Sequence, residues 1–397
     1  MSRTRIDGLR ELIVDLGLAG ALVSKPENVY YFTGVYPIES TFLIVPRDGD
    51  PCILVAPSSY NEAREKAAVE VVMGGLDMTR VLRRCLLEKN CLPRQRGVFL
   101  RDAITRVFVP PLGVEGESLG VGLAEGLGLE KTVDITPYIM EMRMVKDRRE
   151  RRAIRRACEI ADEALERVLE RIRPGMREAE VSGIFDREAK KLGGNETKAR
   201  VRSGRNSAKP FAKIMDGVVG RGPLMIDYGA TYENYWSDIT RTFHVGRPGE
   251  GFEYAYEAVI EARRIGLRNV MAGVEVSRVD KAVREVLTDY GYGDCIVYTS
   301  GHGVGLEVHE PPLISVHQPR PEIPKFQGSS DAERLYRSMV SFFYVDEEPS
   351  FQKNTVVAYE PGIYLEGFGV RIEDMVLVRE KPEILSRLPT GLDEITL

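Results

Sequence analysis

The feature of this sequence that most constrains its fold is an internal repeat in the C-terminal half, where two stretches match at an offset of about 98 residues. Each stretch has the pattern of two amphipathic helices that end at a glycine, followed by a strand. Two copies predict an α+β domain with internal pseudo-two-fold duplication. The alternative is chance, because any two amphipathic helices share their apolar spacing. Pro174-Gly175, Glu180-Val181, Phe185 and Leu192-Gly193 recur as Ala272-Gly273, Arg278-Val279, Val283 and Tyr290-Gly291.

The length and the charge of the chain set broad limits on its organisation and partners. A chain of 397 residues exceeds the size at which one hydrophobic core keeps growing, so we expect two domains. A net charge of -5 gives no electrostatic reason to expect nucleic acid or an anionic membrane as a partner.

The cysteines and the apolar runs bear on the compartment. Five cysteines form no CxxC pair, and their odd number favours a reduced, cytoplasmic protein over a disulfide framework. We find neither a signal peptide nor an apolar run long enough to span a membrane.

The pattern of predicted secondary structure changes near Pro137. Before it, short β-rich runs at 21–23, 41–45 and 51–55 alternate with helical patterns such as 60–68, which predicts an α/β domain over residues 1–135. After it, long helices begin, the first with a capping box in which Glu150 follows Asp147. We therefore assign residues 136–397 to the second, duplicated domain.

Each half of the duplicated domain continues into a predicted β-hairpin that carries two carboxylates. Asp227 and Asp238 flank a polar tip near Glu233-Asn234, and antiparallel pairing would set the two acids opposite one another. Glu360 and Glu373 flank a turn at Glu366-Gly367 in the same way. Four carboxylates in apolar strands cannot be buried without a cation, because an unpaired buried charge is costly.

Two of the four histidines in the chain lie seven residues apart in the glycine-rich stretch from Gly301 to Glu310. With neutral His302 as a fifth ligand, four carboxylates would balance the charge of two divalent ions. Oxygen ligands with one imidazole suit Mn²⁺ or another first-row ion better than a metal that prefers thiolates. Two such ions polarise a carbonyl and generate hydroxide between them, so the implied chemistry is hydrolysis.

As a set, these motifs resemble those of the pita-bread metallopeptidases, the family of methionine aminopeptidase, aminopeptidase P and prolidase. The resemblance lies in IDYGATY, SDITRTFHVG, SGHGVGLEVHE, YEPGIY and VRIED. The segment from Pro26 to Gly34 is similar to the creatinase-type N-terminal domain of the proline-specific members. The resemblance therefore implies a C-terminal pita-bread fold preceded by an α/β creatinase-type domain.

The resemblance also implies a role for each site residue. Asp238 and Glu373 would bridge the ions, and Glu360 would move a proton from the attacking water to the leaving nitrogen. His309 would steady the scissile peptide and its tetrahedral intermediate, and Arg371 would support the acids and the substrate. The implied metal ligands are Asp227, Asp238, His302, Glu360 and Glu373. The two ions would be Mn²⁺ or Co²⁺, with Zn²⁺ and Fe²⁺ as alternatives.

Two features depart from the family pattern. A histidine that contacts the substrate is expected after the segment from Ser203 to Pro210, but Phe211 stands there. The connection between His309 and Glu360 is also longer than in the family, which implies an insertion at about 316–351 with a short helix at 331–340. The insertion could form a lid, a dimer contact or a surface excursion.

The leading hypothesis is a two-metal Xaa-Pro dipeptidase that cleaves the bond before proline in short peptides, most like prolidase. Such bonds need a dedicated pocket, because the proline amide has no hydrogen and its ring fixes φ. One alternative is a non-catalytic homologue that binds peptide or protein and keeps its metals as structural ions. The other is an aminopeptidase P that takes longer peptides. The resemblance implies a homodimer, and His244 and His317 are interpreted as structural or surface residues.

Overall fold

The computed structural model of the chain describes residues 2–37, 41–73, 111–116, 132–212, 214–316 and 348–397. Contacts divide the described residues into two compact units, and the division along the chain falls between Arg143 and Met144. His317, the helix expected at 331–340 and most of the expected insertion lie outside the described residues. Within the described residues, no helix is both long enough and apolar enough to cross a membrane.

The first unit contains a mixed six-stranded sheet in the order β4-β3-β2-β1-β5-β6. Strand β1 pairs antiparallel with β2 and parallel with β5, so the sheet contains both kinds of pairing. The expected strands at 21–23, 41–45 and 51–55 and the expected helix at 60–68 are all confirmed. The strands are β1 Gly20–Val23, β2 Phe42–Pro46, β3 Cys52–Val55, β4 Glu70–Met73, β5 Leu112–Val114 and β6 Thr132–Asp134; the helices are α1 Ser2–Asp15, α2 Pro26–Thr33, α3 Tyr60–Lys66 and α7 Thr136–Met144.

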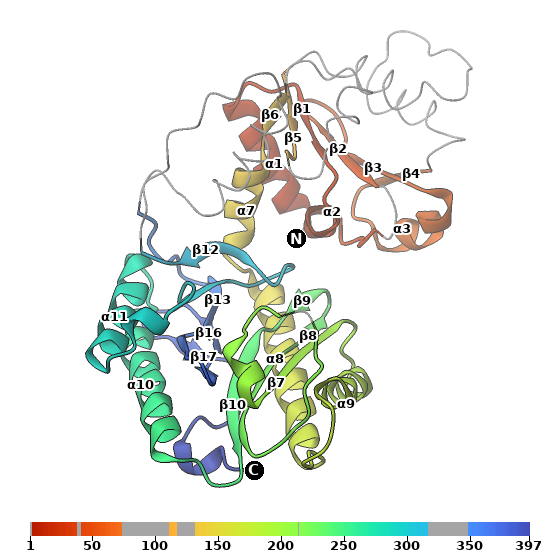
Figure 1. Cartoon of the computed structure of the whole chain (residues 1–397). Helices are drawn as coiled ribbons and strands as arrows, with labels where there is room; N and C mark the ends of the chain where they lie inside the picture. The colour runs from red at the N-terminus through yellow and green to blue at the C-terminus, as the bar shows by residue number, and fades with distance from the viewer. Residues whose placement is uncertain (1, 38–40, 74–110, 117–131, 213, 317–347) are drawn as a thin grey trace, which may run out of the picture. The chain divides into compact units, whose positions relative to one another are not determined.

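The second unit repeats the order helix, helix, strand, as the internal repeat predicts. Figure 1 shows α10 and α11 along one flank of this unit and α9 along the other, with strands between them. Matching glycines take the same left-handed backbone: φ is 95° at Gly175 and 83° at Gly273, then 97° at Gly193 and 86° at Gly291. The first copy is α8 Arg148–Leu169, α9 Glu178–Lys191 and β7 Thr197–Ser203, and the second is α10 Glu250–Leu267, α11 Ser277–Asp289 and β11 Gly301–Gly303.

Helix α8 begins as its sequence predicts. The Asp147 carboxylate accepts hydrogen bonds from the backbone N–H groups of Arg149 and Glu150, and the Glu150 carboxylate accepts one from the Asp147 N–H. This reciprocal cap satisfies N–H groups that the first turn leaves unpaired. One face of the helix is apolar and buried, and it packs against β8. Its residues include Ala153, Ile154, Ala157, Ala161, Ala164 and Leu165.

The first carboxylate hairpin forms, but its register differs from our prediction. The turn is tight, with φ of 48° at Glu233 and 65° at Asn234, which is the geometry of a two-residue hairpin. This turn sets Asp227 opposite Thr240 and not opposite Asp238. The expectation that the two acids face each other directly is therefore wrong by two residues, although a shift of two keeps both on one face. The strands are β8 Gly222–Tyr232, β9 Tyr235–Trp236 and β10 Ile239–Val245, in a sheet of order β10-β8-β7.

The second carboxylate hairpin has the predicted register. Its pairing is β13 with β16 on one side of the acids and β14 with β15 on the other, and both pairings place Glu360 opposite Glu373. Glu360 and Glu373 lie in the gap between the two strand pairs, so neither acid belongs to a regular stretch of backbone pairing. The strands are β12 Glu310–Ile314, β13 Val356–Tyr359, β14 Gly362–Tyr364, β15 Gly369–Arg371, β16 Asp374–Leu377 and β17 Glu383–Ile384.

The backbones of the two hairpins form a bridge at Thr240 and Glu373. The Glu373 N–H donates to the Thr240 carbonyl at 3.0 Å, and the Thr240 N–H donates to the Glu373 carbonyl at 3.4 Å. The Arg241 guanidinium donates to the Glu373 carbonyl and to the buried Asp374 carboxylate, which ties the same junction from behind. The four carboxylates of the two hairpins are consequently brought to one place.

Gly229 lies where the two strands of the first hairpin approach too closely for a side chain. A Cβ at this position would lie 2.1 Å from the Ser237 carbonyl oxygen. We expect Gly229→Ala to lower the free energy of unfolding by about 1–3 kcal/mol, as overpacking of a buried site does. Urea denaturation of the full chain measures the change.

The matched control is Gly183→Ala on the exposed face of α9, where an added Cβ meets nothing within 4 Å. It should leave stability unchanged or raise it by about 0.5–1 kcal/mol. Equal stability of the Gly229→Ala variant and the parent chain would contradict the close approach.

Candidate metal centre

The strands β7, β8 and β10 arrange charged side chains in two rows. Arg200 is opposite Asp227, which is opposite Thr240. In the neighbouring row Lys198 is opposite Gly229. The register of β8 with β10 places Asp238, just before β10, on the other side of Gly229. Because rows two residues apart share a face, the acids and both cations point to the same side of the sheet.

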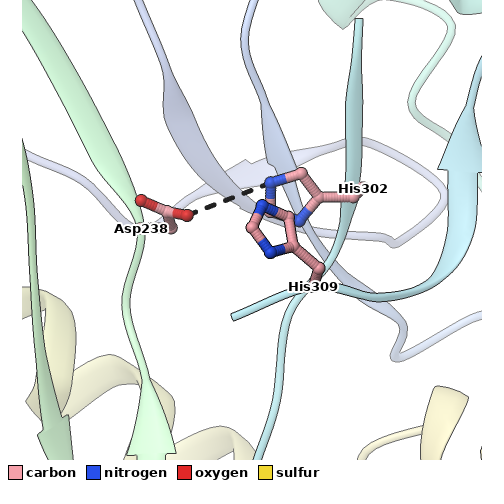
Figure 2. A group of neighbouring side chains, drawn as sticks. All are labelled: Asp238, His302 and His309. Carbon is pink, nitrogen blue, oxygen red and sulfur yellow. Dashed lines mark ion pairs between the residues drawn. The ribbon is translucent and has the colours of Figure 1, made fainter. Parts of the chain in front are cut away.

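His302 enters from β11 with one ring nitrogen free for a ligand. Its Nδ1 lies 3.0 Å from the Gly303 carbonyl oxygen, and the hydrogen bond assigns the proton to Nδ1. Its Nε2 lies 3.5 Å from Glu360 Oε1 and 3.9 Å from Asp238 Oδ2, and Figure 2 shows the second of these approaches. Burial, only partly offset by the Asp238 carboxylate, lowers the pKa of His302 to about 4. The imidazole is therefore neutral at neutral pH, as a metal ligand must be.

The predicted metal ligands converge in three overlapping groups, and the candidate ligand atoms of each group lie within 4.8 Å of one another. Asp238, His302 and Glu373 each belong to two groups, so the three groups form one continuous cluster. The three groups are Asp227, Asp238 and Glu373; His302, Glu360 and Glu373; and Asp238, His302 and His309.

His309 lies at the open side of this cluster. Its ring centroid is 4.3 Å from that of His302, with the two planes tilted by 54°, and Figure 2 shows both rings facing Asp238. His302 is buried, whereas His309 is exposed. Partial burial also lowers the pKa of His309, so this ring too is neutral at neutral pH and can donate or accept a hydrogen bond.

The carboxylates of the cluster have opposed pKa shifts. Burial raises the pKa of Glu360 to about 8, against the opposing effect of Arg371. Burial and the neighbouring Asp238 carboxylate raise the pKa of Glu373 well above its ordinary value. Burial acts in the same direction on Asp227, but Lys198 and Arg371 outweigh it and hold the pKa of Asp227 well below its ordinary value. Without a divalent cation the cluster therefore keeps protons on some of its acids.

Arg371 connects both hairpins behind the acids. Its Nη2 donates to Asp227 Oδ2 at 2.8 Å and its Nε donates to Thr240 Oγ1 at 2.9 Å. The Thr240 hydroxyl in turn donates to Glu373 Oε2 at 2.5 Å. The fifth side chain in this network is Tyr364, whose hydroxyl lies 3.3 Å from Arg371 Nη1. These bonds fix the orientation of two acids, the usual role of groups that surround metal ligands.

Lys198 is a site residue that our sequence reasoning missed. Its Nζ lies 2.6 Å from Asp238 Oδ1 and 2.9 Å from Asp227 Oδ1. Burial opposes its charge, but the carboxylates of Asp227 and Asp238 raise the pKa of Lys198 above its ordinary value. In the sequence TKARVRS, Lys198 alternates with Arg200 and Arg202, which is the pattern of a strand face exposed to solvent. Only the pairing register of β7 with β8 shows that Lys198 lies at the acids.

The side chains present fit a pair of divalent ions. Four buried carboxylates and one neutral imidazole form an oxygen-rich donor set, of the kind that first-row divalent ions accept. Asp227 Oδ1 and Asp238 Oδ1 both lie beside the Lys198 ammonium, at 2.9 and 2.6 Å, so this pair of oxygens is arranged to bind a cation.

Phe211, at the position where a family histidine is expected, lies at the edge of the same network. Its ring is 66% exposed, and its centroid is 5.4 Å from that of Tyr298. The Tyr298 hydroxyl lies 2.6 Å from the Tyr364 hydroxyl and 3.4 Å from Arg371 Nη1. His244 is elsewhere: it is buried, bonds to the Gly246 carbonyl and packs against Phe252, so it is a structural residue.

Comparison with known proteins identifies the class. Residues 152–380 match Metallopeptidase family M24, and residues 5–145 match the Creatinase/Prolidase N-terminal domain. Because the first match covers more than half of the chain, the chain belongs to Metallopeptidase family M24. The predicted pita-bread fold with a creatinase-type N-terminal domain is confirmed, and the chain is a metallopeptidase of this family.

Individual relatives are similar over nearly the whole length. An Xaa-Pro dipeptidase of Pyrococcus furiosus is 31% identical over 95% of this chain and 96% of its own length. An Xaa-Pro dipeptidase structure from Bacillus anthracis matches with a TM-score of 0.82 and 25% identity, covering 100% of both chains. An X-Pro aminopeptidase structure from Thermotoga maritima matches with a TM-score of 0.78 and 28% identity, covering 99% of both chains.

The pKa shifts predict how the stability of the metal-free protein depends on pH. The raised pKa of Glu360 means that the folded protein binds its proton more tightly than the unfolded chain, so stability falls as pH rises from 4.5 to about 8. The lowered pKa of His302 acts oppositely, but only between about 4 and 6.5. From pH 6.5 to 8 we therefore expect the free energy of unfolding to fall, by up to about 1.4 kcal/mol per pH unit for each carboxyl.

Chemical denaturation of chelator-treated protein at pH 6.5, 7.2 and 8 measures this slope. Glu360→Gln should flatten it, because the amide does not titrate in this range. A metal-free protein that gains stability across this range would contradict the assignment.

Proposed function

We propose that this chain hydrolyses the peptide bond before proline in short peptides, as an Xaa-Pro dipeptidase. The observation that carries the proposal is the convergence of four carboxylates and His302, with exposed His309 beside them. Similarity to an Xaa-Pro dipeptidase over 95% of the chain supports the choice of substrate.

In this proposal the five converging side chains hold two divalent ions. Asp238 and Glu373 would be shared between the two ions, Asp227 would complete one position, and His302 with Glu360 would complete the other. Mn²⁺ or Co²⁺ suits this oxygen-rich set, with Zn²⁺ and Fe²⁺ as alternatives. When bound, two such ions polarise the scissile carbonyl and make a water molecule nucleophilic at neutral pH.

Glu360 moves the proton. Its Oε1 faces His302 Nε2 at 3.5 Å, and the strand register places it opposite Glu373. With the acids deprotonated around two ions, the Glu360 carboxylate could take a proton from the attacking water and return it to the leaving proline nitrogen. Both transfers use one side chain.

His309 acts on the substrate. It is exposed while its neighbour His302 is buried, and its neutral ring can donate a hydrogen bond to the carbonyl oxygen of the scissile bond. A donor aimed at the charge that develops on this oxygen stabilises the transition state more than the ground state. Arg371 supports this geometry by holding Asp227 and Thr240.

A specific observation favours a second candidate function. The X-Pro aminopeptidase from Thermotoga maritima matches this chain about as well as the dipeptidase structure does. An aminopeptidase would accept longer peptides that begin Xaa-Pro. Peptide length therefore separates the two candidates.

The wider proposal concerns assembly, location and domain limits. We propose a cytoplasmic homodimer, with residues 1–135 as the N-terminal domain and 136–397 as the catalytic domain. Among the described cysteines, Cys52, Cys158 and Cys295 are free thiols, which agrees with a reducing compartment. No nucleic acid or membrane partner is part of the proposal.

Hydrolysis assays on purified full chain test the function. We expect Mn²⁺-loaded protein to cleave Xaa-Pro dipeptides faster than tripeptides and longer Xaa-Pro peptides, and His302→Ala to reduce kcat/KM by about 10²-fold or more. His244→Gln is the control, because this histidine lies outside the cluster, and it should keep the parent activity.

Removal of the metal by a chelator should abolish cleavage, and added Mn²⁺ or Co²⁺ should restore it. Faster cleavage of longer peptides would support the aminopeptidase. No cleavage with Mn²⁺, Co²⁺ or Zn²⁺, by protein that holds two ions per chain, would refute the enzymatic proposal.

Substitution of Phe211 tests the departure from the family pattern. We expect Phe211→His to raise kcat, because an imidazole at this exposed position can donate a hydrogen bond that the phenyl ring cannot. Phe211→Leu, which removes the ring without adding a donor, is the matched control and should not raise it. Steady-state kinetics on one Xaa-Pro dipeptide measures both. Unchanged kcat in the histidine variant would show that the site makes its substrate contacts without this position.

A further inference from the structure

Lys198 places an ammonium group inside the carboxylate cluster. Its Nζ lies 2.9 Å from Asp227 Oδ1 and 2.6 Å from Asp238 Oδ1, and its side chain is only 16% exposed. Gly229, directly opposite Lys198 on β8, has no side chain, so the lysine can reach across the sheet to both acids. The contact is therefore built into the strand register.

The ammonium and a divalent ion would compete for the same oxygens. A metal bound to Asp227 Oδ1 and Asp238 Oδ1 would lie about 2.0–2.2 Å from each oxygen, in the space that Nζ now fills. The two cations also repel each other at such distances. A divalent ion at this position must displace Lys198.

The other position has no such competitor among the described residues. His302, Glu360 and Glu373 form a group whose ligand atoms lie within 4.8 Å. The cation nearest to Glu360 is Arg371, at 4.0 Å, and this guanidinium makes its short contact with Asp227 instead. An ion can therefore bind to this group without expelling a charged side chain.

We propose that Lys198 is a tethered cation that competes with a divalent ion for Asp227 and Asp238. An ion at this position must expel the ammonium, so Lys198 lowers the affinity of the position. The position formed by His302, Glu360 and Glu373 is not weakened in this way. This inference rests on the proposed two-metal function and gives Lys198 control over one of its two positions.

Metal titration of the full chain tests whether Lys198 competes with a divalent ion. Metal-free protein is titrated with Mn²⁺ by calorimetry, and bound ions are counted by equilibrium dialysis. We expect one tight and one weaker ion in the parent chain. In Lys198→Met the second dissociation constant should fall by about tenfold or more, while the first changes by less than about twofold.

The matched control is Arg200→Met, on the same strand and two residues away. Arg200 Nη1 lies 3.7 Å from Asp227 Oδ2, but its side chain is 46% exposed and solvent screens its charge. We expect this substitution to change either dissociation constant by less than about threefold. Lys198→Gln keeps a hydrogen-bond donor without the charge, and carries the test if Lys198→Met does not fold.

Thermal unfolding provides a readout that is independent of turnover. Without metal, Lys198→Met and Lys198→Gln should unfold at a lower temperature than the parent chain, because the two acids lose their counter-charge. Saturating Mn²⁺ should raise their unfolding temperature by more than it raises that of the parent chain.

Two contrary outcomes are distinguishable. If the parent chain binds two ions and neither Lys198 substitution changes either dissociation constant, the inference is overturned while the proposed function stands. If the parent chain binds no Mn²⁺ at all, both the proposed function and the inference are overturned.

Discussion

Mutual repulsion among four buried carboxylates is the constraint on which the rest of this structure depends. Asp227, Asp238, Glu360 and Glu373 are all nearly inaccessible to solvent, and they come from two hairpins that meet at the pairing of Thr240 with Glu373. Burying four such groups together is strongly unfavourable unless cations or protons compensate them. The pKa values of Glu360 and Glu373 are raised, first by burial and also by the neighbouring acids, and Arg371 offsets this rise only in part.

The positive side chains that compensate these acids are distributed unevenly around the cluster. Arg371 and Lys198 neutralise the Asp227 side, so that the pKa of Asp227 is held low. In the part of the chain that the structure describes, Glu360 has Arg371 only at 4.0 Å, and Glu373 forms no ion pair with a lysine or arginine. Behind the cluster, the buried Asp374 is paired with two arginines of its own and therefore does not draw on the cations of the site. The unequal distribution of fixed positive charge is why we expect the two metal positions to differ.

Much of this arrangement could be predicted from the sequence. The repeat predicts two helix-helix-strand units, and matching left-handed glycines at Gly175 and Gly273 show that the units are alike in backbone as well as in order. The turn at Glu366-Gly367 predicts the opposition of Glu360 and Glu373. These predictions succeed because glycine stops and turn residues act locally, through the few φ and ψ values that they allow.

The remainder depends on registry between strands that are distant in the sequence. The first hairpin is shifted by two residues because its turn is centred on Glu233 and Asn234, which sequence alone does not distinguish from a looser tip. Lys198 belongs to the site only because β7 pairs with β8 so that Gly229 faces it. Both depend on which backbone atoms pair across the sheet, and composition and spacing do not determine that pairing.

The central claim is that two ions occupy this cluster, and anomalous diffraction from crystals of the full chain grown with Mn²⁺ tests it most directly. The account predicts two anomalous peaks about 3.5–4 Å apart. Asp238 and Glu373 should contact both peaks, His302 with Glu360 one, and Asp227 the other. The absence of any peak in the cluster, or a peak that these five side chains do not contact, would contradict the account.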